Sequence, residues 1–158
     1  MTYWLLKYVH VIGAAVLLGT GAGIAFFMLW AHRTGEVAVI AGVARIVVTA
    51  DFLFTASAVV VQPVTGVALA RFLGYPILDG WIALSLVLYA VTGAFWLPVV
   101  WMQIRMRDLA AEAVHAGSSL PLQYHRLFHW WFAFGFPAFA AVLAIFWLMI
   151  TRPQLSFR

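Results

Sequence analysis

Four long apolar stretches constrain this chain more than any other feature. They cover residues 3–30, 37–72, 81–104 and 125–151, and short polar segments separate them. About 20 apolar residues let one helix cross a bilayer, whereas a tilted strand needs about 10. In lipid, every backbone polar group must be bonded within the protein, and stretches of this length achieve that as helices. The sequence therefore predicts an all-α integral membrane bundle of four transmembrane helices, up-down-up-down.

Composition argues against a water-soluble domain. Of the 158 residues, 66% are hydrophobic and 9% are charged, whereas a soluble domain has about 25% charged residues. The length suits one transmembrane domain, residues 1–158. Cysteine is absent, which excludes disulfides and thiolate metal sites. The basic residues form no run, so we expect contact with lipid headgroups and no nucleic acid. We also expect no cleavable signal peptide, because the first apolar stretch is too long.

The distribution of basic residues gives an expected orientation. Both chain ends are expected on one side of the membrane, since the number of spans is even. That side carries Lys7, Arg71, Arg152 and Arg158, and the other carries Arg33, Arg45, Arg105, Arg107 and Arg126. The slight excess favours the second side as cytoplasmic under the positive-inside rule. The termini are therefore expected outside.

Polar side chains inside the spans indicate which faces point inward. At helical spacing, one stripe of the second span holds Asp51, Thr55, Ala58, Gln62, Thr65 and Gly66. The other polar positions on inward stripes are His10, Ser85, Tyr89, Thr92, Trp96, Gln103, His125 and His129. Sorted by depth, one polar layer near the termini holds His10, Gln62, Ser85 and Tyr89. A second layer on the other side holds Asp51, Gln103, His125 and His129.

His10 has two interpretations. It can be the axial ligand of a haem b, with Gln62 and Tyr89 as neighbouring or opposing groups, because small residues after it leave room for a flat ring. Alternatively, it bonds to Gln62 or Tyr89 and holds two helices together. His125 and His129 lie at the opposite end of the bundle and cannot share a haem with His10. No metal is expected beyond a haem iron at His10.

Asp51 also has two interpretations. A carboxylate at membrane depth costs about 2.5–3.5 kcal/mol unless it is neutral or paired. It can therefore relay protons, or it can be paired with His129 or Arg45. In the same span, Pro63 marks a possible bend and leaves the Val59 carbonyl without its helical donor. Thr55 or Gln62 are the expected replacements.

Gly19 and Gly23 form a smooth face with Ala15 on the first span. Small residues at this spacing allow close helix approach. We expect this face to pack inside the bundle, and the alternative is that it docks a second protomer or another membrane protein.

Several segments resemble a known family. They are KYVHVIG (7–13), ADFLFT (50–55), QPVTG (62–66), WLPVVW (96–101) and GFPAF (135–139). They are similar to the bacterial integral membrane family labelled domain of unknown function 2269. The resemblance implies a four-helix protein of the bacterial cytoplasmic (inner) membrane and supplies no established activity.

A shorter motif resembles HemJ and the CopD-like membrane proteins. Their first helix carries a Lys-x-x-His-x-x-Gly pattern, which Lys7, His10 and Gly13 match. HemJ uses its histidine for haem in protoporphyrinogen oxidation, so the resemblance implies His10 as a haem ligand. Where HemJ has a functional lysine one turn after a tryptophan, this chain has Ser85 after Trp81, which argues against that activity.

The leading hypothesis from the sequence is a small haem-b-binding redox or haem-handling membrane protein. One alternative is a proton-coupled transporter or accessory subunit without a cofactor, in which Asp51, Gln62, Gln103 and His129 line a pathway. The other is a structural membrane partner that docks through Gly19 and Gly23.

Overall fold

The computed structural model describes residues 1–78 and 80–155, so Arg158 of the charge comparison lies outside the described residues. The helices are α1 (Thr2–Thr34), α2 (Val37–Ala50), the π-helical turn η1 (Asp51–Thr55), α3 (Ala56–Phe72), α4 (Gly80–His115) and α5 (Leu122–Thr151). Since α2, η1 and α3 form one continuous run, the chain has four helices that are long and apolar enough to cross a membrane. The predicted all-α class is confirmed.

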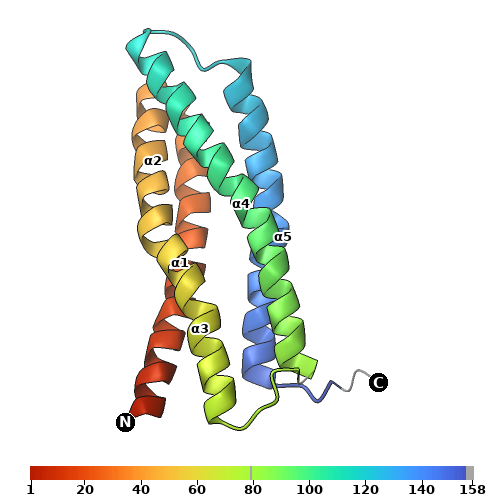
Figure 1. Cartoon of the computed structure of the whole chain (residues 1–158). Coiled ribbons are helices and arrows are strands. Elements are labelled where there is room, and N and C mark those ends of the chain that lie inside the picture. Colours follow the sequence, from red (N-terminus) through yellow and green to blue (C-terminus); the bar gives the residue numbers. More distant parts are fainter. Residues whose placement is uncertain (79, 156–158) are drawn as a thin grey trace.

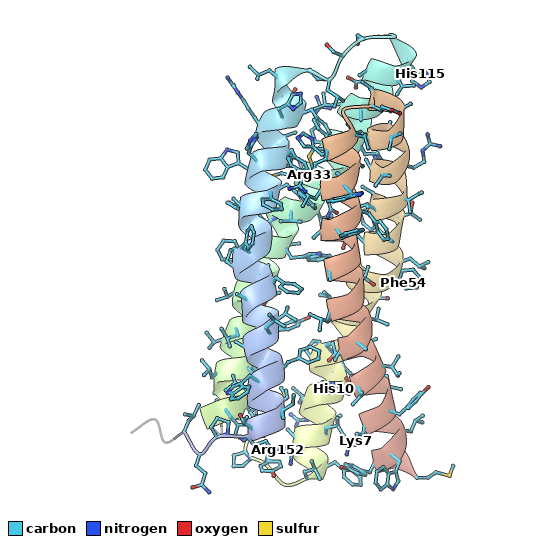
Figure 2. All side chains as sticks on the ribbon, turned by 180° about the vertical axis from the view of Figure 1, so that it is seen from behind. Lys7, His10, Arg33, Phe54, His115 and Arg152 are labelled. Carbon is cyan, nitrogen blue, oxygen red and sulfur yellow. The ribbon has the colours of Figure 1, made fainter. Side chains whose placement is uncertain are left out.

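The helices stand side by side, and consecutive long helices run in opposite directions (Figure 1). α1 packs against α2 and α3, α4 packs along α5, and α2 packs on α4. Direct contact between α1 and α5 is slight. Lys7 and Arg152 lie at one end of the bundle, and Arg33 and His115 lie at the other (Figure 2). The charged ends are therefore separated by the length of the apolar helices.

Two apolar clusters hold the helices together. The larger one joins α1, α2, α4 and α5, and its largest fully buried side chains are Met28, Ile40, Met106 and Tyr124. The smaller one lies near the opposite end and contains Ala70, Trp81, Ile82 and Leu148. Large apolar side chains on the outer surface, such as Phe54 and Trp101, are exposed. That pattern suits helices whose outer faces meet lipid.

The irregular part of the second span is the π-helical turn η1, whereas Pro63 lies inside the α-helix α3. Pro63 has no N–H to donate to the Val59 carbonyl. The hydroxyl of Tyr89 on α4 donates to that carbonyl instead. The prediction that Thr55 or Gln62 would do so was wrong, because the donor comes from another helix.

Among the described residues, the smooth face of Gly19 and Gly23 meets no other helix. A Cβ atom at Gly19 would meet nothing within 4 Å, and one at Gly23 would meet only Phe27 of the same helix, at 3.8 Å. The expectation that this face packs inside the bundle is therefore wrong, and docking of another chain there stays a prediction. The close approach on α1 is at Gly13, where a Cβ atom would collide with the amide of Gln62.

Candidate functional site

A cavity of about 430 Å³ lies halfway along the bundle, between α1, η1, α3, α4 and α5. Gly21, Gly93 and Gly135 line it from three different helices. A Cβ atom at each of these glycines would meet nothing within 4 Å. The missing side chains therefore leave space between the helices, and most of the remaining wall is apolar.

The cavity opens sideways. Its exposed lining residues belong to α1 and α5: Ala22 and Ala25 on α1, and Phe132, Phe136 and Phe139 on α5. Phe136 is 64% exposed, whereas the lining residues of η1, α3 and α4 are buried or half-buried. Because α1 and α5 barely touch, the opening lies between them and faces the surface where the acyl chains of lipids lie.

The inner wall of the cavity is polar and is centred on Asp51. This residue is 3% exposed. Its Oδ1 accepts a hydrogen bond from Nε1 of Trp96 at 3.4 Å. Among the described residues, its Oδ2 is buried and makes no hydrogen bond of good geometry. The side chain of Thr55, one turn further along η1, interacts with the same carboxylate. A buried polar atom without a partner costs about 1–3 kcal/mol, so a suitable group entering the cavity would be bound at this wall.

The structure divides the predicted second polar layer. Asp51 and Gln103 both line the cavity, whereas His125 and His129 do not. His129 is exposed, and its Nδ1 contacts the His125 carbonyl of its own helix at 2.6 Å. The predicted partners of Asp51, His129 and Arg45, are both exposed, and Trp96 takes their place. Trp96 was on the predicted inward stripe, but its bond to Asp51 was not foreseen.

His10 lies outside the cavity lining and ties α1 to α3. Its Nδ1 is 2.8 Å from Oγ1 of Thr65. The Thr65 hydroxyl also lies 2.8 Å from the Val61 carbonyl. A hydroxyl that donates to this carbonyl can accept a hydrogen bond from Nδ1–H of His10. Nε2 of Gln62 donates to the main-chain carbonyl of His10 at 2.8 Å. The imidazole therefore bonds to Thr65, where Gln62 or Tyr89 was expected.

The two groups predicted to face His10 across a haem are engaged elsewhere. Gln62 bonds to the His10 carbonyl and Tyr89 bonds to the Val59 carbonyl. The predicted trio of His10, Gln62 and Tyr89 is therefore not a ready ligand set. Within residues 1–78 and 80–155, no three His, Cys, Asp or Glu residues are grouped as metal ligands.

The sequence model of one family, described as a predicted integral membrane protein (DUF2269), matches residues 4–153. The chain belongs to the DUF2269 family. No curated protein and no solved structure matches the chain. The resemblance to HemJ and the CopD-like proteins therefore stays a prediction, and a function for this DUF2269 protein has to be argued from its cavity.

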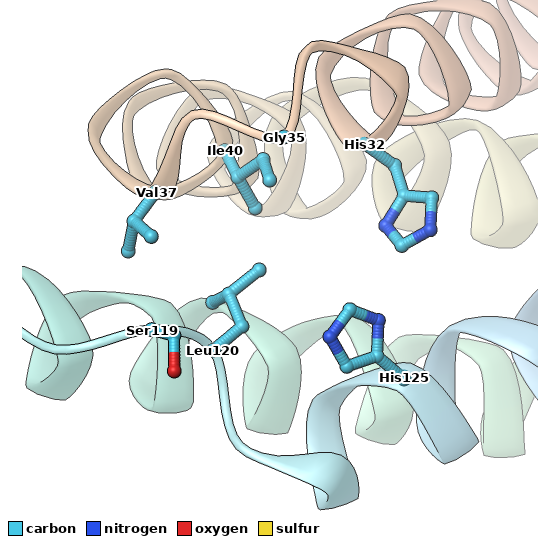
Figure 3. Close-up of a pocket in the computed structure, with 7 residues that line it drawn as sticks. All are labelled: His32, Gly35, Val37, Ile40, Ser119, Leu120 and His125. Carbon is cyan, nitrogen blue, oxygen red and sulfur yellow. The ribbon is translucent and has the colours of Figure 1, made fainter.

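A second, smaller pocket of about 230 Å³ lies at the end of the bundle away from the termini. His32 and His125 face each other across it (Figure 3), with ring centroids 5.7 Å apart. His32 also stacks on Phe128 with centroids 3.7 Å apart. The sequence placed His32 in a polar turn and missed this contact. The depth of His32 in the membrane could have predicted the contact with His125, because the end of the first span and the start of the fourth are expected on the same side of the bilayer.

Proposed function

We propose that this DUF2269 protein binds an apolar small molecule that enters from the bilayer, and that it acts as a binding or carrier protein of the bacterial inner membrane. The observation that carries the proposal is the sideways opening between α1 and α5. It leads from the lipid-facing surface to a cavity at mid-bundle whose inner wall holds Asp51. A ligand taking this route stays in an apolar medium throughout.

The cavity has the features of a small-molecule site. Such sites measure about 300–1,000 Å³ and combine mostly apolar walls with a few polar groups that fix the ligand's orientation. Here the apolar walls come from α1 and α5, and the polar groups come from η1 and α4. An apolar ligand body would lie along the first pair of helices, with its polar end toward the second.

The transporter hypothesis changes accordingly. Its pathway was expected to include Asp51, Gln62, Gln103 and His129. The side chain of Gln62 on α3 is already hydrogen-bonded to the His10 carbonyl on α1, and His129 is exposed. Asp51 and Gln103 remain as the pathway groups, since both line the cavity.

The proposal is tested by filling the cavity. The purified protein in phosphatidylcholine nanodiscs would be titrated with 1-pyrenemethanol, and binding would be followed by energy transfer from tryptophan to pyrene. We expect saturable binding that Gly93→Phe or Gly135→Phe removes, because both changes place a large ring in the cavity. Gly19→Phe is the matched control, because it adds the same ring to an exposed face of α1. Equal binding by the wild type and all three variants would refute the proposal.

Haem binding at His10 is the second candidate. The observation in its favour is the bond between Nδ1 of His10 and Thr65, because ligating histidines use such a bond to present Nε2 to a metal. Against it stands the engagement of Gln62 and Tyr89 described above. An absorbance spectrum of protein from haem-replete cells, before and after dithionite, decides the matter. A Soret band that His10→Ala removes would establish this candidate, and a colourless protein would end it.

A further inference from the structure

We infer that the cavity selects a lipophilic amine, an apolar molecule with one protonated nitrogen, and that Asp51 is the residue that holds the nitrogen. This inference rests on the proposed function, because it names the class of ligand for the same cavity. It starts from the carboxylate of Asp51 on the inner wall, whose Oδ2 makes no hydrogen bond of good geometry among the described residues, although the Thr55 side chain interacts with the same carboxylate.

The hydrogen-bonding groups of the inner wall favour a ligand that donates. The indole N–H of Trp96 is used by Asp51, the hydroxyl of Tyr89 by the Val59 carbonyl, and the hydroxyl of Thr92 by the Leu88 carbonyl at 2.9 Å. Gln103 offers both a donor and an acceptor and so does not discriminate. The Thr55 hydroxyl can donate to Asp51 and still accept a bond from a ligand. Acceptor positions therefore remain at both residues, and an ammonium group, which carries only donors, suits them.

Charge favours the same ligand. The residues that line the cavity include Asp51 but no Lys, Arg or His. A carboxylate at membrane depth is costly without a counter-ion. A ligand ammonium would supply that counter-ion, whereas a neutral ligand would not and an anionic ligand would be repelled.

Aromatic rings around the carboxylate add a further preference. Trp96, Trp131, Phe132, Phe136 and Phe139 line the cavity. A cation within about 6 Å of the centre of such a ring is attracted by the negative face of the ring. The rings also give the apolar body of the ligand a contact surface, so one cavity can hold both parts of a lipophilic amine.

The experiment compares three probes that share one apolar body. They are 1-pyrenemethylamine, 1-pyrenemethanol and 1-pyreneacetic acid, which are cationic, neutral and anionic at neutral pH. Each is titrated into phosphatidylcholine nanodiscs that hold the whole protein, and energy transfer from tryptophan reports binding. Partition into lipid is measured with Gly93→Phe and subtracted. We expect the amine to bind about tenfold more tightly than the alcohol, which corresponds to about 1.4 kcal/mol, since a hydrogen bond to a charged group is roughly twice as strong as one between neutral groups, and we expect the acid to bind most weakly.

Substitutions at the inner wall assign the preference to its residues. Asp51→Asn keeps the shape and is expected to bring the ratio of amine to alcohol affinity close to one, while alcohol binding persists. Asp51→Glu keeps the charge and should keep the preference. Thr55→Val removes the second acceptor and should lower the ratio of amine to alcohol affinity without bringing it to one. Because this variant keeps Asp51, it provides a second test of the inner wall that does not depend on how the Asp51 variants fold.

The outcomes separate this inference from the proposed function. If the alcohol and the amine bind equally and Gly93→Phe removes both, the cavity is a ligand site but the amine selection is wrong. If Asp51→Asn binds alcohol and still prefers the amine, Asp51 is not the residue responsible and the inference fails. If no probe shows saturable binding that Gly93→Phe removes, the proposed function and the inference fail together.

Discussion

The hydroxyl of Tyr89 on α4 donates a hydrogen bond to the main-chain carbonyl of Val59 on α3. That carbonyl lacks a helical donor because Pro63 follows it by one turn. α3 and α4 have little other direct contact. Because Tyr89 and Val59 also line the cavity, one bond both satisfies the backbone and fixes the distance between two cavity walls.

This relationship predicts an energetic coupling between Tyr89 and Pro63. Tyr89→Phe should lower the free energy of unfolding by about 0.6 kcal/mol, the average for a side-chain hydrogen bond in a membrane protein. In a Pro63→Ala background, the restored N–H would bond to Val59, so the same substitution should have a smaller effect. Unfolding by SDS in mixed micelles, followed by helicity, measures both differences. An equal effect of Tyr89→Phe in the two backgrounds would contradict the coupling.

Gly13 is predicted to be intolerant of any side chain. A Cβ atom at this position would collide with the amide of Gln62, which donates to the His10 carbonyl. Gly13→Ala should therefore displace Gln62 and lower stability by about 1–3 kcal/mol. Gly19→Ala is the matched control on the same helix, because its Cβ atom would meet nothing within 4 Å. Thermal unfolding in detergent compares the two variants. Equal unfolding midpoints would show that the close contact between Gly13 and Gln62 does not require a glycine.

Asp51 is predicted to lower the free energy of unfolding of the protein without ligand, while it provides the binding group for the amine. Its carboxyl group is buried, and the hydrogen bond that it accepts from Trp96 is long, at 3.4 Å. Asp51→Leu should therefore raise the free energy of unfolding by about 1–2 kcal/mol, less than the full penalty because Trp96 loses its acceptor. The same substitution should abolish the preference for the amine probe.

Gln62 supplies the contrast for that measurement. It is also a buried polar residue of the second span, but its amide is bonded to α1. Gln62→Leu should lower the stability in the same SDS titration in which Asp51→Leu raises it. If both substitutions destabilise the protein alike, Asp51 has a structural role that its contacts do not reveal.

The sequence predicted what depends on segment length and on the spacing of polar residues. Four apolar stretches gave four helices, and the second ran over the expected residues, from Val37 to Phe72. The stripes that contained Asp51 and Gln103 pointed inward, and both residues line the cavity. Both results follow from the penalty on polar groups in lipid, which acts on each helix separately.

Features that depend on which helices are neighbours could not be predicted in this way. Pro63 revealed a carbonyl in need of a donor, but only the position of α4 relative to α3 in the bundle brings Tyr89 to it. The π-helical turn at Asp51–Thr55 has no sequence signature comparable to a proline. The sideways opening arises because α1 and α5 separate, and no single helix encodes that distance.

Tyr124 gives the last prediction. Its side chain is 0% exposed, and within the part of the chain that the structure describes its hydroxyl has no hydrogen-bond partner. Its ring nevertheless belongs to the larger apolar cluster and stacks on the ring of His32, and the two ring centroids are 5.9 Å apart. Tyr124→Phe should therefore raise the free energy of unfolding by about 1 kcal/mol, since it removes an unsatisfied buried hydroxyl and keeps the ring. Tyr124→Ala should lower it by about 3–5 kcal/mol through loss of the ring. Thermal unfolding in detergent tests both, and a destabilised Tyr124→Phe would show that the hydroxyl is bonded in the membrane, which points to a bound water at this end of the bundle.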